Sequence, residues 1–246
     1  MNLCSNIDFS KYKHFISLGG NCYVAEDLSH MGLRDCSYPF DWLFSDDFSG
    51  IVLAIEDRFK DLTTEHLLFQ HKNNRSRYYN QKYKFSFFHD FSKYLPLSKQ
   101  LAEVKTKYER RSERFLKDIS EPTIFFRYVI SKNDYDYIIT EGNRIEQMLK
   151  SFCPENRIIY LVHHNVFDNY EFDHYIISKD TDDWITRTPL QKNKDLEKRL
   201  LDFYYENREK NLNYKKILLQ PKKFSIEKSL RRIFKKEYIH SKEYGK

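Results

Sequence analysis

Hydrophobic positions along the chain follow two different periods, which predicts that strands and helices alternate. Apolar runs typical of buried strands occupy residues 14–18, 123–130, 157–164 and 173–178, and an alternating aromatic run over 77–91 is typical of a strand or hairpin. Amphipathic runs with the period of a helix cover residues 23–31, 46–59, 98–119, 133–152 and 194–210. This succession predicts an α/β fold, with a mixed sheet flanked by helices.

The basic charge of the chain is concentrated at its C-terminal end. The formal net charge is +6, and residues 222–246 account for all of it. We expect an α/β domain over residues 1–192, followed over 193–246 by a helical extension with a basic tail. The pattern over 224–236 predicts a basic amphipathic helix, which suits peripheral contact with an anionic membrane and equally suits docking on the domain. We expect no nucleic acid as partner, because no recognition motif accompanies the charge.

The composition and motifs exclude several classes of protein. No apolar run approaches the roughly 18–20 residues of a spanning helix, and the first residues lack the apolar stretch of a signal peptide. The four cysteines lie far apart and form no CxxC pair, which argues against a disulfide framework and a zinc site. We therefore expect a cytoplasmic protein. The GxGxxG, GxSxG and GKS/GKT motifs are absent, and we expect no cofactor.

Two adjacent glycines and a cysteine mark the turn between the first predicted strand and helix, in "SLGGNC". A sulfur at a helix start feels the helix dipole, so we expect a lowered pKa for the Cys22 thiol. Asn21 and the Cys22 backbone N–H are candidate donors to an oxyanion. Gly19 and Gly20 would let a substrate approach the backbone. A buried structural cysteine after a tight turn is the alternative.

Two further stretches, "SYPFDWLFS" and "FFHDF", carry polar residues next to large rings. His89 is the best-placed imidazole, since the end of an aromatic run can hold a ring partly dry. Asp41 or Asp90 is the candidate to orient it, and Trp42 is a candidate substrate contact. Adjacent strand residues point to opposite faces, so Asp90 qualifies only if the strand ends before it. The alternatives are a loop-capping role for Asp41, a core position for Trp42 and a hydrogen-bonded His89.

Arg127 is a charge inside the apolar run 123–130 and needs a partner. It would either hold a substrate carboxylate or phosphate, or pair with an internal Asp. His163 and His164 end another predicted strand, a common site position in α/β sheets. No third ligand follows at a recognisable spacing, so we expect no metal site.

Five stretches taken together resemble a bacterial family of largely uncharacterised proteins described as papain-like cysteine peptidases. They are "SLGGNCYVAEDL", "GLRDCSYPFDWLFS", "FFHDF", "ERRSERF" and "TIFFR", and they cover about half the chain, residues 14–130. The resemblance implies that Cys22 is the nucleophile and His89 the base. It also implies a papain-like fold and a link to cell-surface polysaccharide biosynthesis. The strand–helix alternation after residue 120 is more typical of a doubly wound sheet, so both architectures stay open.

We therefore expect a cysteine-dependent hydrolase or acyltransferase acting on a glycan, peptide or acyl substrate, with Cys22 and His89 as its reactive pair. A different enzyme class is the first alternative: a sugar- or phosphate-handling transferase that binds phosphate at the Gly19–Gly20 turn, assisted by Arg127. The second alternative is a non-enzymatic adaptor on a membrane-associated complex.

Overall fold

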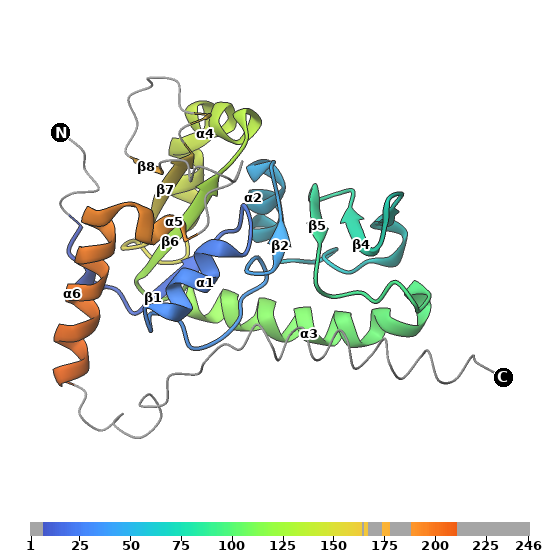
Figure 1. Cartoon of the computed structure of the whole chain (residues 1–246), viewed down its shortest axis with the longest axis horizontal. Coiled ribbons are helices and arrows are strands. Elements are labelled where there is room, and N and C mark those ends of the chain that lie inside the picture. Colours follow the sequence, from blue (N-terminus) through green and yellow to red (C-terminus); the bar gives the residue numbers. More distant parts are fainter. Residues whose placement is uncertain (1–6, 164, 167–173, 178–187, 211–246) are drawn as a thin grey trace. The chain divides into compact units, whose positions relative to one another are not determined.

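The computed structural model describes residues 7–163, 165–166, 174–177 and 188–210. The chain divides into two units, Met1–Glu206 and Asn207–Lys246, and nearly all the described residues belong to the first. That unit contains two four-stranded sheets (Figure 1). The α/β class expected from the sequence is confirmed, with the parallel and the antiparallel strands separated into different sheets. The basic tail, residues 222–246, lies outside the described residues.

The first sheet is parallel throughout, in the order β1-β6-β7-β8. Its strands are β1 (His14–Ser17), β6 (Thr123–Val129), β7 (Arg157–His163) and β8 (His174–Ile177). Parallel neighbours need a crossover connection, and α4 (Lys132–Lys150) supplies it between β6 and β7. All seven residues of β6 are buried, as expected for a central strand covered on both faces.

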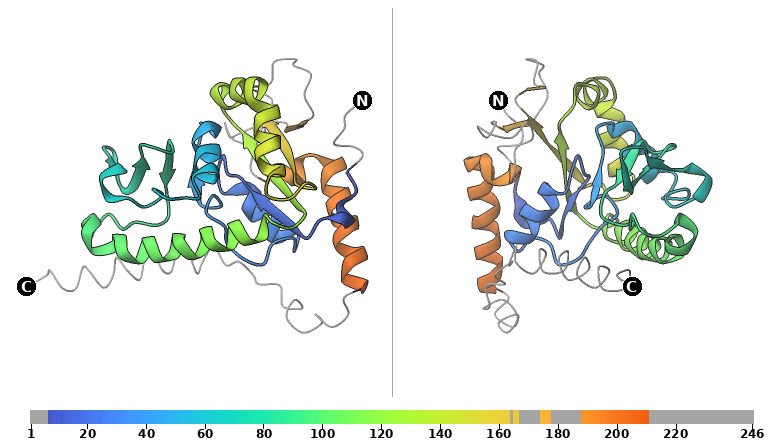
Figure 2. Two further views of the ribbon diagram at one scale, coloured as in Figure 1. Left: turned by 180° about the vertical axis from the view of Figure 1, so that it is seen from behind. Right: turned by 45° about the vertical axis from the view of Figure 1, so that its right-hand side comes forward.

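Alternate residues of β6 face two different helical layers. Ile124, Phe126 and Tyr128 pack in one core with α1 (Tyr23–His30) and α6 (Lys194–Lys210). Figure 2 shows α6 beside α1. The opposite face, with Phe125 and Val129, packs in a second core with α2 (Phe48–Glu56), α3 (Leu97–Asp118) and α4. These helices contribute Ile51, Phe115 and Ile138 to that core. The parallel sheet is therefore the middle of three layers.

The second sheet is antiparallel, in the order β2-β5-β4-β3. Its strands are β2 (Leu43–Phe44), β5 (Phe85–Phe87), β4 (Asn74–Asn80) and β3 (Leu68–His71). One face is buried against α3, with the Phe87 and Tyr108 rings 5.1 Å apart. Of the strand or hairpin predicted over 77–91, the structure has the hairpin, formed by β4 and β5, and the short strand β2 lies inside "SYPFDWLFS".

Residues beyond the expected boundary at 192 belong to the first unit. Leu196 and Leu200 on α6 are fully buried, and α6 follows the short helix α5 (Pro189–Lys192). Two 3₁₀ turns, Phe9–Lys11 and Glu65–Leu67, complete the described elements. None of the helices in the described part of the chain is long and apolar enough to cross a membrane.

Candidate functional site

The glycine pair makes the turn from β1 into α1, and both glycines are buried. Gly19 has φ +78° and Gly20 φ +99°, in the left-handed region that favours glycine. A Cβ on Gly20 would lie 2.3 Å from the Tyr128 carbonyl oxygen, and one on Gly19 would lie 3.4 Å from that of Phe40. The glycines therefore serve the backbone turn and its close packing on β6. This role is structural, and the approach of a substrate to these glycines stays a prediction.

Asn21 and Cys22 sit directly at the start of α1. The Asn21 side chain accepts a hydrogen bond from the Tyr23 backbone N–H through Oδ1, at 3.0 Å. Asn21 is only 7% exposed, and its amide nitrogen Nδ2 is buried. This nitrogen has no hydrogen-bond partner among the described residues. An unpaired buried donor costs free energy, so its presence beside a thiol marks this turn as a place where an acceptor fits.

The thiol of Cys22 is half-buried and not activated in this structure. Burial raises its pKa to about 12, and the nearby Glu26 carboxylate contributes in the same direction. The Cys22 backbone N–H opposes this shift without overcoming it. The expectation of a lowered pKa is therefore wrong, because desolvation of the thiolate outweighs the helix end.

His89 follows the end of β5 and is exposed, contrary to the expectation of a partly dry ring. It meets the Trp42 ring edge-on, with centroids 6.3 Å apart. Among the described residues, no hydrogen bond joins His89 to Cys22, Asp41 or Asp90. The imidazole that the sequence predicts as the base thus has the Trp42 ring as its neighbour.

Both candidate orienting acids are engaged elsewhere. Asp41 is fully buried, and its Oδ2 accepts from the Tyr38 backbone N–H at 2.7 Å and from Arg34 at 2.6 Å. Burial raises the pKa of Asp41 to about 6, although Arg34 opposes the shift. Asp90 pairs with Lys107 and accepts from the Tyr108 hydroxyl at 2.8 Å.

Comparisons with known proteins place the chain in a family. Residues 13–165 match the family model described as "Putative papain-like cysteine peptidase (DUF1796)". The chain belongs to this family. It is also 32% identical over 120 residues to the uncharacterized protein R408 of Acanthamoeba polyphaga mimivirus, covering 41% of this chain and 54% of the relative. The chain thus spans about half the length of that relative. No solved structure matches.

In this member of the family, Arg127 is buried and holds together the segments around the turn that leads to Cys22. All five of its guanidinium N–H groups are used: on Leu18 O, on Ser45 Oγ and O, and twice on Asp134. Both partners of the Arg127–Asp134 pair are fully buried. Of the two roles that the sequence left open, the structure favours the internal pair, and no guanidinium N–H remains for a substrate.

Arg34, which was not among the predicted site residues, joins three parts of the site. Its guanidinium donates to the carbonyl of Ala25 on α1 and to Asp41, and it lies over the Trp42 ring at 5.5 Å. The feature that could have identified Arg34 is its position in "GLRDCSYPFDW", one of the stretches that carry the family resemblance. Glu26 was also not predicted as a site residue. It lies four residues after Cys22 on the same helix, and residues at this spacing are neighbours.

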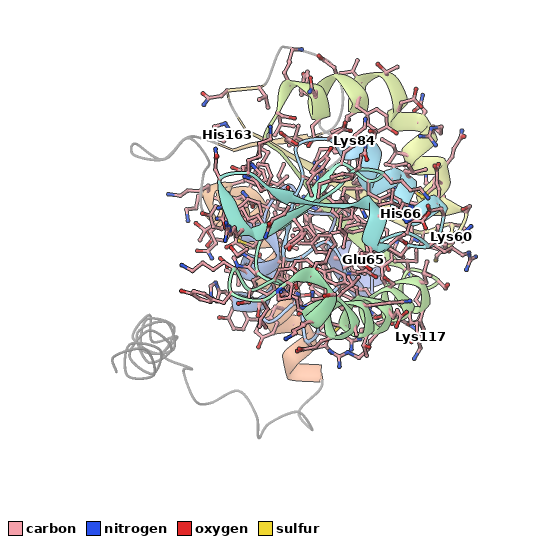
Figure 3. The ribbon with its side chains drawn as sticks, turned by 90° about the vertical axis from the view of Figure 1, so that its right-hand side faces the viewer. Lys60, Glu65, His66, Lys84, Lys117 and His163 are labelled. Carbon is pink, nitrogen blue, oxygen red and sulfur yellow. The ribbon has the colours of Figure 1, made fainter. Side chains whose placement is uncertain are left out.

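The two remaining features lie outside this cluster. His163 is buried at the end of β7, as expected, with its ring 6.5 Å from that of Tyr128, while His164 lies outside the described residues. A groove of about 570 Å³ separates residues 58–65 from α3, and none of the candidate site residues lines it. Figure 3 shows Lys60 and Glu65 of this groove on one side and His163 on the other.

Proposed function

We propose that this chain is a cysteine-dependent hydrolase or acyltransferase with Cys22 as its nucleophile. The Cys22 sulfur attacks a carbonyl carbon, and the thiol proton passes to His89. The tetrahedral oxyanion accepts hydrogen bonds from Asn21 Nδ2 and the Cys22 backbone N–H. The leaving group departs with the proton from His89, and water or an acceptor then takes the acyl group from sulfur. The observation that carries this proposal is the buried, unpartnered amide of Asn21 beside the thiol.

The raised pKa of Cys22 fits a nucleophile that is protected until substrate arrives. At neutral pH the thiol is protonated, so attack needs a base within hydrogen-bond reach. His89 is exposed and contacts Trp42, another candidate site residue. We propose that the Cys22–His89 pair forms when substrate is bound, since catalytic hydrogen bonds often tighten only then.

The substrate class follows from the resemblance and stays broad: a glycan, peptide or acyl compound, in cell-surface polysaccharide biosynthesis. We propose a cytoplasmic location, with residues 222–246 in peripheral contact with an anionic membrane. Flotation with vesicles containing anionic lipid, for the full chain and for a chain ending at residue 221, tests this contact. Equal flotation of both chains would contradict it.

Acylation by p-nitrophenyl acetate tests the catalytic proposal, with intact mass and release of p-nitrophenolate as readouts. We expect an acetyl group on Cys22 in the native protein and none on the Cys22→Ser variant within the same time. Cys36→Ser is the matched control, because Cys36 is the other half-buried free thiol among the residues that the structure describes. Its acylation rate should equal that of the native protein.

Asn21→Ala separates oxyanion stabilisation from simple thiol reactivity. Removing one oxyanion donor typically slows acyl transfer by about 10²–10³-fold. Alkylation of Cys22 by iodoacetamide forms no oxyanion, so its rate should stay close to native. Equal slowing of both reactions, or of neither, would contradict the assigned role of Asn21.

A further inference from the structure

One face of the antiparallel sheet is open and carries rings. Cross-strand partners share a face, and Phe69 pairs with Tyr79, Tyr79 with Ser86, and Ser86 with Phe44. These four residues form a row across β3, β4, β5 and β2. Phe69 is 51% exposed and Tyr79 36%, whereas the neighbouring Tyr78 is buried. The row is therefore on the face turned away from the core.

A fourth ring and a stacked cation extend this row. Phe88 lies 5.5 Å from Phe44 between ring centroids, and the Arg77 guanidinium lies 3.7 Å from the centre of the Phe88 ring. Arg77 and Tyr79 are two residues apart on β4, so both belong to the open face. We call Phe44, Phe69, Arg77, Tyr79 and Phe88 the aromatic face.

The segment that builds most of this face is strongly basic. Residues 66–89 contain five Lys/Arg and no Asp or Glu. Lys82 and Lys84 are neutralised by acids from elsewhere, Asp57, Asp61 and Asp47. Lys72, Arg75 and Arg77 form no salt bridge with any described residue. The aromatic face thus combines exposed rings with unneutralised positive charge.

We propose that the aromatic face binds single-stranded nucleic acid. Unpaired bases stack on aromatic side chains of an open sheet, and nearby cations hold the phosphate backbone. A duplex keeps its bases stacked on each other and offers no free base plane to Phe69 or Tyr79. This binding goes beyond the proposed acyl transfer and does not use Cys22. No recognition motif is visible along the chain, and no nucleic acid was expected, because the row arises only when four separate segments pair.

Fluorescence anisotropy with labelled oligothymidylate and oligouridylate of about 12 nucleotides, close to common single-strand site sizes, tests the proposal. We expect Phe69→Ala and Tyr79→Ala each to weaken binding about fivefold or more. Fivefold corresponds to about 1 kcal/mol, the lower end of the range for the loss of one stacked base. Arg75→Ala should reduce the slope of log K against log salt by about 0.7. Tyr94→Ala and Lys117→Ala, at exposed positions outside the aromatic face, are the matched controls and should bind as the native chain does.

Every variant keeps the basic tail, so the comparison isolates the aromatic face. Melting temperature and Cys22 alkylation should be unchanged, which verifies the fold and separates this test from that of the catalytic proposal. Absence of oligonucleotide binding at low salt, or undiminished binding by Phe69→Ala and Tyr79→Ala, would overturn the proposal. Equally tight binding of a duplex of the same length would overturn it as well. If the same substitutions weakened heparin binding as much, the face would belong to acidic glycans instead.

Discussion

Replacing Arg127 by Met separates a structural role of this residue from substrate binding. The substitution removes five hydrogen bonds and leaves Asp134 fully buried without its cation. Removing one partner of a buried ion pair typically costs about 3–5 kcal/mol. For a unit of this size, 1 kcal/mol corresponds to about 2–4 °C in melting temperature, so we expect a decrease of roughly 6–20 °C near pH 7.5.

The pH dependence of this loss gives a second, independent readout. Burial raises the pKa of Asp134 to about 6 even with Arg127 present. Without Arg127 that pKa rises further, so the variant's folded state binds a proton more tightly than its unfolded state. The variant should therefore recover stability as pH falls from about 7.5 towards 5. Thermal unfolding followed by circular dichroism, repeated across this range, measures both effects.

Arg144→Met is the matched control for Arg127→Met. Arg144 is exposed and pairs with Glu56 and Glu141, and such surface pairs contribute about 0–1 kcal/mol. Arg127→Met/Asp134→Leu should regain part of the loss, because it removes the uncompensated charge. If Arg127→Met kept the native melting temperature but lost acylation, the structural role would be refuted. Arg127 would then be a substrate-binding residue.

Three further predictions concern the turn at Gly19–Gly20 and helix α1. Burial raises the pKa of Asp27 to about 7, above its unfolded value of 3.8. The free energy of unfolding should therefore fall as pH rises from about 4 to 7, and urea unfolding of Asp27→Asn should lack this pH-dependent contribution. Glu26→Gln should lower the pKa of Cys22 and speed its alkylation at pH 9, by about tenfold for each pKa unit, and an unchanged rate would exclude Glu26. Gly20→Ala should destabilise the chain by about 2 kcal/mol or more in urea unfolding, whereas Gly142→Ala, where a Cβ meets nothing within 4 Å, should be neutral or stabilising.

The elements of the fold were largely predictable because their signals are local. The apolar stripe of 98–119 corresponds to α3 within one residue, and the amphipathic run 46–59 contains α2 and extends two to three residues beyond its ends. The short strand β2 was not predictable, since its two residues acquire a strand conformation only by pairing with β5. The division into two sheets likewise depends on long-range pairing, which periodicity does not report.

The chemistry of Cys22 shows a different limit. The sequence places the thiol at a helix start, and the structure confirms that position. Whether the pKa falls or rises depends on how far the surrounding side chains exclude water, which spacing along the chain does not contain. Here burial is the larger effect, and Glu26, one helical turn away, adds to it.

The acids near His89 show why adjacency in sequence is a poor guide to a catalytic partner. β5 ends at Phe87, so the condition under which Asp90 was expected to orient His89 is met. Asp90 nevertheless pairs with Lys107 and Tyr108 on α3, while His89 meets Trp42. A carboxylate held by a cation and a hydroxyl gains little by turning away from them to the imidazole. If His89 is the base of the acyl transfer proposed above, the group that orients it must come from the substrate or from a rearrangement that releases one of these acids.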